Sequence, residues 1–353
     1  MNTRYSLELN ASQLPVQAEF EQARERGDAL LADLTKASIA GMIANPDNMR
    51  TFDLPGSDRQ FGMLVHQPED GDPNKLLIFH SSFAGGKNAD SVAEALYMRE
   101  VVDPSATLMI QMNGSRVGEK SPMNFSDNDR RLLKGRYLAP FVKRTQAVVE
   151  SIGNPEDQVV FGASQGAAVA LAYSGDHDSA AVATAVLDVP TLPLDEPRTF
   201  NQLRKNFGSS GKGLKDIMIG NFSDPEWRFA KEMDAQYGLL GTVRQVAGMV
   251  RHGKDNLAIP HTLLSQAAES QMFAALGKSD DATLVHSWTT ESAVSSLESN
   301  LDVHARIRKS FNGERYQGIV ARGPHGVALS YEFCAQSSLL ARTMRSHAGL
   351  RRK

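Results

Sequence analysis

The 353-residue sequence contains a single cysteine, Cys334, which excludes a disulfide within the chain. Its charges nearly balance at a net −3, so it lacks the basic excess typical of nucleic-acid-binding proteins. No apolar run approaches the roughly 18 residues that a membrane span requires, and residues 1–14 lack the apolar segment of a signal peptide. We therefore expect a cytoplasmic protein with no nucleic-acid partner and no membrane span.

Sequence patterns for metals and cofactors are also missing. One cysteine cannot form a cysteine cluster, and no pair of histidines has metal-ligand spacing beside a carboxylate. The segment Gly208-Ser209-Ser210-Gly211-Lys212 has the glycines of a phosphate-binding loop, but no strand precedes it and no serine or threonine follows the lysine. We expect no metal and no cofactor, and we interpret this segment as a flexible joint.

The most informative segment is Val159–Ala172, which reads VVFGASQGAAVALA. Residues of high strand propensity lead into GASQG at 162–166, and small helix-forming residues follow. A strand, a sharp turn and a helix with the pattern G-x-S-x-G form a nucleophile elbow, in which the turn projects a serine hydroxyl and the glycines avoid side-chain clashes. Amides at the helix start would stabilise negative charge near Ser164. The alternative is a glycine-rich turn without a catalytic serine.

Strand-like and helix-like segments alternate along most of the chain, which predicts an α/β fold with a mostly parallel, twisted sheet flanked by helices. The exception is Thr191–Ser279, where helix-like pieces follow one another without a clear buried strand. We therefore divide the chain into an N-terminal helical extension (1–48), a sheet domain (49–190 and 283–353) and an inserted helical cap (191–282). The predicted elements are a helix over Gln17–Ala44, a hairpin over Met49–Leu54 and Gln60–His66, strands over Lys75–Phe79, Thr107–Met112, Val182–Leu187, Thr283–Trp288 and Tyr316–Ala321, and helices over Ser91–Val101, Arg130–Ile152, Ala293–Lys309 and Val327–Arg345.

The elbow, the order of the elements and the place of the insertion after the sixth strand resemble the α/β-hydrolase superfamily. The resemblance covers roughly Met49–Pro190 and Thr283–Arg345. It implies the α/β-hydrolase fold, with catalytic residues in the chain order serine, acid, histidine. It identifies a superfamily and no substrate.

The general base is expected at His325, in the segment GPHG at 323–326 that directly follows the last predicted strand. The resemblance places the catalytic histidine there, and glycine and proline fix a loop from which an imidazole can reach a serine hydroxyl. Most other histidines fall on the early hairpin, in the cap or on surface helices. His286 falls inside the seventh strand, where a core role is expected.

The acid must hold the imidazole in the correct tautomer. The resemblance places it after the seventh strand, where Glu291 is the nearest carboxylate. Asp188, after the sixth strand, is the alternative, because some members of the fold carry the acid there, and Asp302 is a more distant candidate. Without a catalytic role, Glu291 would be a charge at a helix start, and Asp188 a turn residue before Pro190.

An oxyanion hole needs two backbone amides aimed at one point. Gln165 follows the serine directly and would supply one. The other is expected from the loop after Lys75–Phe79, which reads HSSFAGG at 80–86. Matching that loop to the resembled proteins puts Ser82 at the donor position, although Ser81 replaces the glycine that usually precedes it.

These residues predict a serine hydrolase that cleaves a carboxylic ester through an acyl-enzyme formed at Ser164. The cap would shape the pocket for a small-molecule acyl substrate. A peptidase, thioesterase or acyltransferase on the same triad remains an alternative, as does a non-catalytic binding module that keeps the fold. The sequence does not indicate the oligomeric state.

Overall fold

The computed structural model describes residues 14–54, 56–81, 89–111, 123–134, 137–176, 180–189, 282–291, 301, 304–305, 307–308, 315–324 and 331–350. Residues 191–281 of the predicted cap lie outside the described residues, as do Ser82, His325 and Asp302. The cap boundaries and the roles of these three residues therefore stay predictions.

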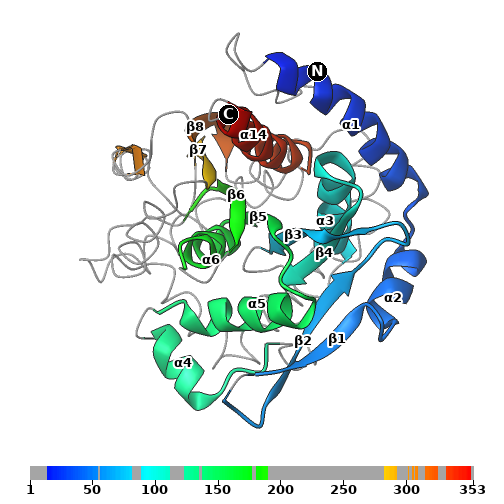
Figure 1. The fold of residues 1–353 in the computed structure, drawn as a ribbon, viewed down its shortest axis with the longest axis vertical. Coiled ribbons are helices and arrows are strands. Elements are labelled where there is room, and N and C mark those ends of the chain that lie inside the picture. Colours follow the sequence, from blue (N-terminus) through cyan, green and yellow to red (C-terminus); the bar gives the residue numbers. More distant parts are fainter. Residues whose placement is uncertain are drawn as a thin grey trace.

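An eight-stranded sheet forms the centre of the protein, in the order β1-β2-β4-β3-β5-β6-β7-β8 (Figure 1). β1 pairs antiparallel with β2, and β2 antiparallel with β4, whereas all the later pairs are parallel. This arrangement confirms the predicted fold class. The strands are β1 (Met49–Asp53), β2 (Gln60–His66), β3 (Asp72–His80), β4 (Ala106–Gln111), β5 (Asp157–Ala163), β6 (Ala181–Leu187), β7 (Thr283–Glu291) and β8 (Tyr316–Pro324).

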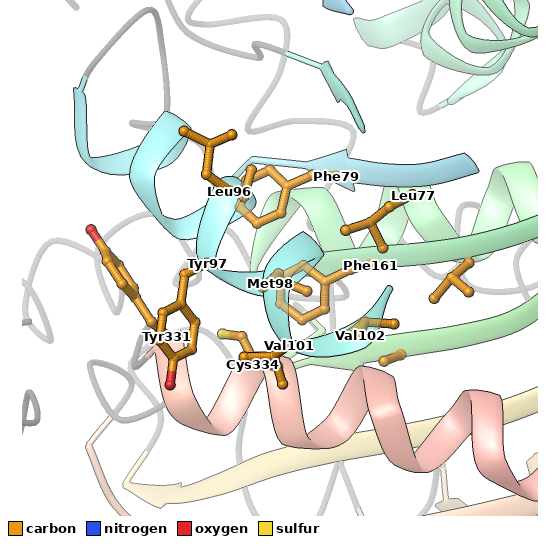
Figure 2. Packing of buried hydrophobic residues seen from close by; sticks show 14 of the residues in the cluster. Leu77, Phe79, Leu96, Tyr97, Met98, Val101, Val102, Phe161, Tyr331 and Cys334 are labelled. Carbon is orange, nitrogen blue, oxygen red and sulfur yellow. The ribbon is translucent and has the colours of Figure 1, made fainter. Parts of the chain in front are cut away.

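Helices cover both faces of the sheet (Figure 1). One face packs against α1 (Leu14–Asp33), α3 (Ala89–Val102) and α14 (Tyr331–Leu350), and the other against α5 (Ala139–Ser151) and α6 (Gln165–Ser174). Figure 2 shows the first face, where aromatic side chains of β3 and β5 stack at a ring separation of 5.4 Å beneath α3 and α14. Burial of the parallel strands on both faces explains why they are continuous apolar runs in the sequence.

Two of the predicted helices are wrong, because each is broken in two. The helix expected over 17–44 is α1 followed by α2 (Lys36–Ala44), and Thr35 caps α2. The Thr35 hydroxyl accepts from the Ser38 amide at 3.1 Å, and the Ser38 hydroxyl accepts from the Thr35 amide at 2.9 Å. The helix expected over 130–152 is α4 (Asp127–Lys134) followed by α5, whose first turn contains Pro140.

A buried ion pair links α4 to α5. The Arg144 side chain is 1% exposed, and its Nη2 lies 2.9 Å from Asp129 Oδ2. The guanidinium also donates to the Met123 carbonyl oxygen at 2.7 Å and lies 4.7 Å from the centre of the Phe125 ring. Burial acts to raise the pKa of Asp129, but hydrogen bonds from Ser126 and Arg144 outweigh it and lower that pKa.

Replacing Asp129 with asparagine should destabilise the protein by about 3 kcal/mol at neutral pH, because the buried Arg144 loses its counter-charge. The folded pKa of Asp129 is depressed, so its stabilisation is present above the ordinary carboxyl pKa and is lost as the pH falls through the folded value. The melting temperatures of the two proteins should therefore converge in acid. Asp127→Asn is the control, since that fully exposed side chain pairs with Arg130 at 2.9 Å and its loss should not shift the melting temperature.

Candidate active site

Ser164 occupies the turn between β5 and α6 in a conformation that few residues adopt. Its φ is 53° and its ψ is −120°, whereas L-residues other than glycine rarely have positive φ. It stands at the N-cap of α6, yet its side chain makes no capping hydrogen bond, so the hydroxyl is left for another role. The Ser164 amide donates to the Leu187 carbonyl oxygen at 2.8 Å, which fixes the turn to β6.

The two glycines beside Ser164 stand where no side chain fits. A Cβ on Gly162 would lie 2.2 Å from the Gly166 carbonyl oxygen, and a Cβ on Gly166 would lie 2.0 Å from the His80 carbonyl oxygen. The start of α6 therefore packs against its own strand and against the end of β3. This close approach is the physical reason for both glycines of the G-x-S-x-G pattern.

Gln165, one of the two residues predicted to form an oxyanion hole, lies at the start of α6. The first amides of a helix have no acceptor within the helix, and Gln165 is the first residue of α6. The contact between Gly166 and the backbone of His80 and Ser81 brings the end of β3 beside this helix start. Ser82 follows Ser81 directly in the sequence. The described start of this loop therefore lies beside the elbow, and the role of Ser82 stays a prediction.

The Ser164 side chain is less accessible than the sequence led us to expect. We expected a hydroxyl that projects to solvent, but Ser164 is 8% exposed and Gln165 is 0% exposed. Both residues are therefore shielded from water, and hydrogen bonds formed in such surroundings are stronger than in water.

Asp188 directly follows β6 and is completely buried, with a φ of 50°. Its carboxylate accepts hydrogen bonds from the Thr289 amide at 3.1 Å and the Thr289 hydroxyl at 2.9 Å. Its own amide donates to the Ser287 carbonyl oxygen at 2.8 Å. Asp188 thus joins the carboxyl end of β6 to that of β7, the strand next to it.

Glu291 is the last residue of β7, so the prediction that this strand ends at Trp288 is wrong. The pairing with β8 continues three positions further, and Glu291 lies opposite Pro324 across the two strands. His325 is the next residue after Pro324. The backbone of one candidate acid is therefore adjacent to the residue that leads into the predicted base.

Buried imidazoles lie near the same edge of the sheet. Burial lowers the pKa of His80 to about 3, and the side chain of Gln111 opposes this shift. Burial also lowers the pKa of His286 to about 3, with a further contribution from His304 and an opposing one from Asp188. Both rings are neutral at neutral pH. The sequence placed His286 in the core, and its 0% exposure confirms this.

One aromatic cluster beneath this edge was not predicted. The His286 and Trp288 rings of β7 are 5.0 Å apart, and His304 packs on Trp288 and donates to or accepts from the Tyr316 hydroxyl at 2.7 Å. Gly318 makes room for His304, since a Cβ there would lie 2.5 Å from that ring. The only sequence signal was the alternation of His286 with Trp288 on β7 and of Tyr316 with Gly318 on β8, and the sequence does not show that these two strands pair or that His304, which lies on neither strand, joins them.

The described residues contain no group of three or more histidine, cysteine, aspartate or glutamate side chains that could hold a metal ion. In the same part of the chain, no helix combines the length and the apolar character needed to cross a membrane.

Solved structures with the same architecture show that this is the α/β-hydrolase fold. Proline iminopeptidase of Mycobacterium smegmatis is 14% identical, with a TM-score of 0.52 over 85% of this chain and 99% of that one. A putative lipase of Acinetobacter baumannii is 13% identical, with a TM-score of 0.52 over 90% and 98% of the two chains. An esterase of Exiguobacterium antarcticum is 11% identical, with a TM-score of 0.52 over 85% and 99%.

No model of a known protein family matches the sequence, and no curated protein matches it. The structural likenesses are all far below the identity at which activity is shared, so they establish the fold alone. The activity must be argued from the site.

Proposed function

We propose that the protein is a serine hydrolase with Ser164 as its nucleophile. The observation that carries the proposal is the backbone of Ser164, a non-glycine residue with a φ of 53° whose hydroxyl caps no helix amide. Such strain persists where function requires it. The flanking glycines have no room for a Cβ, as a nucleophile elbow demands.

In the proposed mechanism, the Ser164 hydroxyl attacks an acyl carbonyl carbon and gives its proton to His325. The amides of Gln165 and Ser82 hold the resulting oxyanion, and the leaving alcohol takes the proton from His325. Water then attacks the acyl-enzyme, with the same histidine as base. His80 and His286 are poor alternatives to His325 as the base, because an imidazole with a pKa of about 3 accepts a proton weakly near neutral pH.

Glu291 is the proposed orienting acid, and its place opposite Pro324 supports that role. The proposed substrate is a small-molecule carboxylic ester, because an alcohol leaves more readily than an amine. We further propose that the 191–282 segment forms the wall of the acyl or alcohol pocket.

Labelling with a fluorophosphonate probe tests the proposal. The wild-type protein should be labelled on the peptide that contains Ser164, and Ser164→Ala should abolish labelling. Ser174→Ala is the matched control, because Ser174 ends the same helix, is also 8% exposed and accepts a hydrogen bond from Thr184 at 2.8 Å. The control should be labelled like the wild type. A wild-type protein that resists the probe would instead be a binding module on this fold.

A further inference from the structure

The side chain of Gln165 is buried without a hydrogen-bond partner. It is 0% exposed, and neither its amide nitrogen nor its carbonyl oxygen is hydrogen-bonded by any described residue. Gln158, at the opposite end of β5, shows the usual arrangement. It is 1% exposed, donates to the Pro155 carbonyl oxygen at 2.8 Å and accepts from the Tyr173 hydroxyl at 2.7 Å.

A buried carboxamide without partners destabilises a protein by about 1–3 kcal/mol, and buried polar groups are nearly always paired. Gln165 is the residue immediately after the proposed nucleophile, at the carboxyl edge of the sheet where ligands of open α/β sheets bind. A ligand bound at this edge would supply the partner that the described residues do not provide.

The same edge holds other buried polar atoms that lack partners among the described residues. They are the two ring nitrogens of His80 at the end of β3, and Ser287 Oγ, His286 Nε2 and Trp288 Nε1 in the middle of β7. Asp188 bonds to the backbone of Ser287, so this part of β7 lies at the edge that carries the candidate site. Near the carboxyl edge, the described residues thus carry more hydrogen-bonding capacity than they use among themselves.

We propose that the Gln165 carboxamide binds a hydroxyl or amide group next to the scissile carbonyl, so that the substrates are esters of α-hydroxy or α-acylamino acids. The inference rests on the proposed function. In the proposed mechanism the backbone amide of Gln165 holds the carbonyl oxygen of the substrate. The Gln165 side chain therefore starts close to that oxygen and can reach a substituent that is a few bonds away from the carbonyl group. A carboxamide offers two donors and an acceptor without charge, which suits a neutral polar group.

The proposal requires that the acyl group binds on the same side of Ser164 as the buried Gln165 carboxamide. A hydrogen bond formed there is worth more than one in water, because the carboxamide has no solvent partner, and none among the described residues, to give up. A site built to bind a polar group discriminates strongly against an analogue that lacks it.

Two pairs of phenyl esters test the inference. Phenyl lactate and phenyl propanoate differ by the α-hydroxyl, and phenyl N-acetylglycinate and phenyl 4-methylpentanoate differ by the amide. For each ester, kcat/KM is divided by its rate constant for hydrolysis by hydroxide. The ratio of this corrected kcat/KM for the polar ester to that for the apolar ester is then compared between proteins. The wild type should prefer the polar member of at least one pair by about tenfold or more, and Gln165→Leu should lower that ratio by about tenfold.

Gln158→Leu is the matched control and should keep the wild-type ratio. It should also melt lower than the wild type, because the Tyr173 hydroxyl loses its acceptor, whereas Gln165→Leu should melt no lower. If Gln165→Leu fails to fold, Gln165→Met takes its place, and if Gln158→Leu fails to fold, Gln146→Leu takes its place as the control. Gln146 lies on α5 and donates at 2.9 Å to Asp176, two residues after the end of α6.

Three results would overturn the inference: a wild type without preference in either pair, a Gln165→Leu protein that keeps the ratio, or no turnover of any of the four esters while Ser164 is labelled. Loss of labelling at Ser164 itself would instead overturn the proposed function.

Discussion

Replacing Glu291 with glutamine should lower kcat by about 10⁴-fold, because the imidazole of His325 would lose the carboxylate that fixes its tautomer and stabilises its charge. The backbone of Glu291 lies opposite Pro324, the residue before His325 in the sequence. The pairing at this position uses main-chain atoms. We therefore expect the melting temperature of Glu291→Gln to remain that of the wild type.

Asp188→Asn should behave in the opposite way. The carboxylate of Asp188 accepts from both the amide and the hydroxyl of Thr289. An asparagine has one oxygen, so its NH₂ group would face one of these donors, at a cost of about 1–3 kcal/mol in stability. We expect a lower melting temperature and a loss of kcat far smaller than that of Glu291→Gln.

Steady-state kinetics on a reactive phenyl ester, with thermal unfolding of the same samples, separates the two carboxylates. If Asp188→Asn loses about 10⁴-fold in kcat and Glu291→Gln stays within tenfold of the wild type, Asp188 is the acid and the place of Glu291 opposite Pro324 has no catalytic meaning. Glu291→Asp offers a further comparison, because it keeps the charge but shortens the reach.

The sequence predicted the parts of the structure that depend on local patterns. The alternation of apolar runs and helical segments gave the sheet class, and G-x-S-x-G marked the turn at Ser164. The breaks in the two long predicted helices also have local sequence signals, which are the Thr35–Ser38 capping box and Pro140. We did not predict the breaks because the apolar periodicity continues across them.

Other features depend on partners that are distant in the sequence and could not be predicted from it. The length of β7 is set by its pairing with β8, which carries the strand through polar residues to Glu291. The left-handed backbone of Asp188 and the burial of the Gln165 carboxamide, without a partner among the described residues, arise from neighbouring strands and tertiary packing. Composition and spacing contain no signal for either.

Gly166→Ala should prevent the protein from reaching its stable native state. The added Cβ would lie 2.0 Å from the His80 carbonyl oxygen and 2.7 Å from that of Ser81, and these backbone atoms cannot rotate away as a side chain can. Relief requires α6 to move off the end of β3, which opens the core on the face of the sheet that α5 and α6 cover. We expect a loss of more than about 4 kcal/mol, seen as little soluble protein or a collapsed melting temperature.

Gly41→Ala provides the contrast, because no atom lies within 4 Å of the added Cβ and Gly41 stands inside α2. That change should be neutral or should stabilise the protein by about 0.5–1 kcal/mol. The comparison tests the geometry of the elbow separately from its chemistry, since a binding module on this fold would need Gly166 as much as an enzyme does. A Gly166→Ala protein that melts with the wild type would mean that α6 and β3 do not approach so closely. The strained turn at Ser164 would then lose its structural cause.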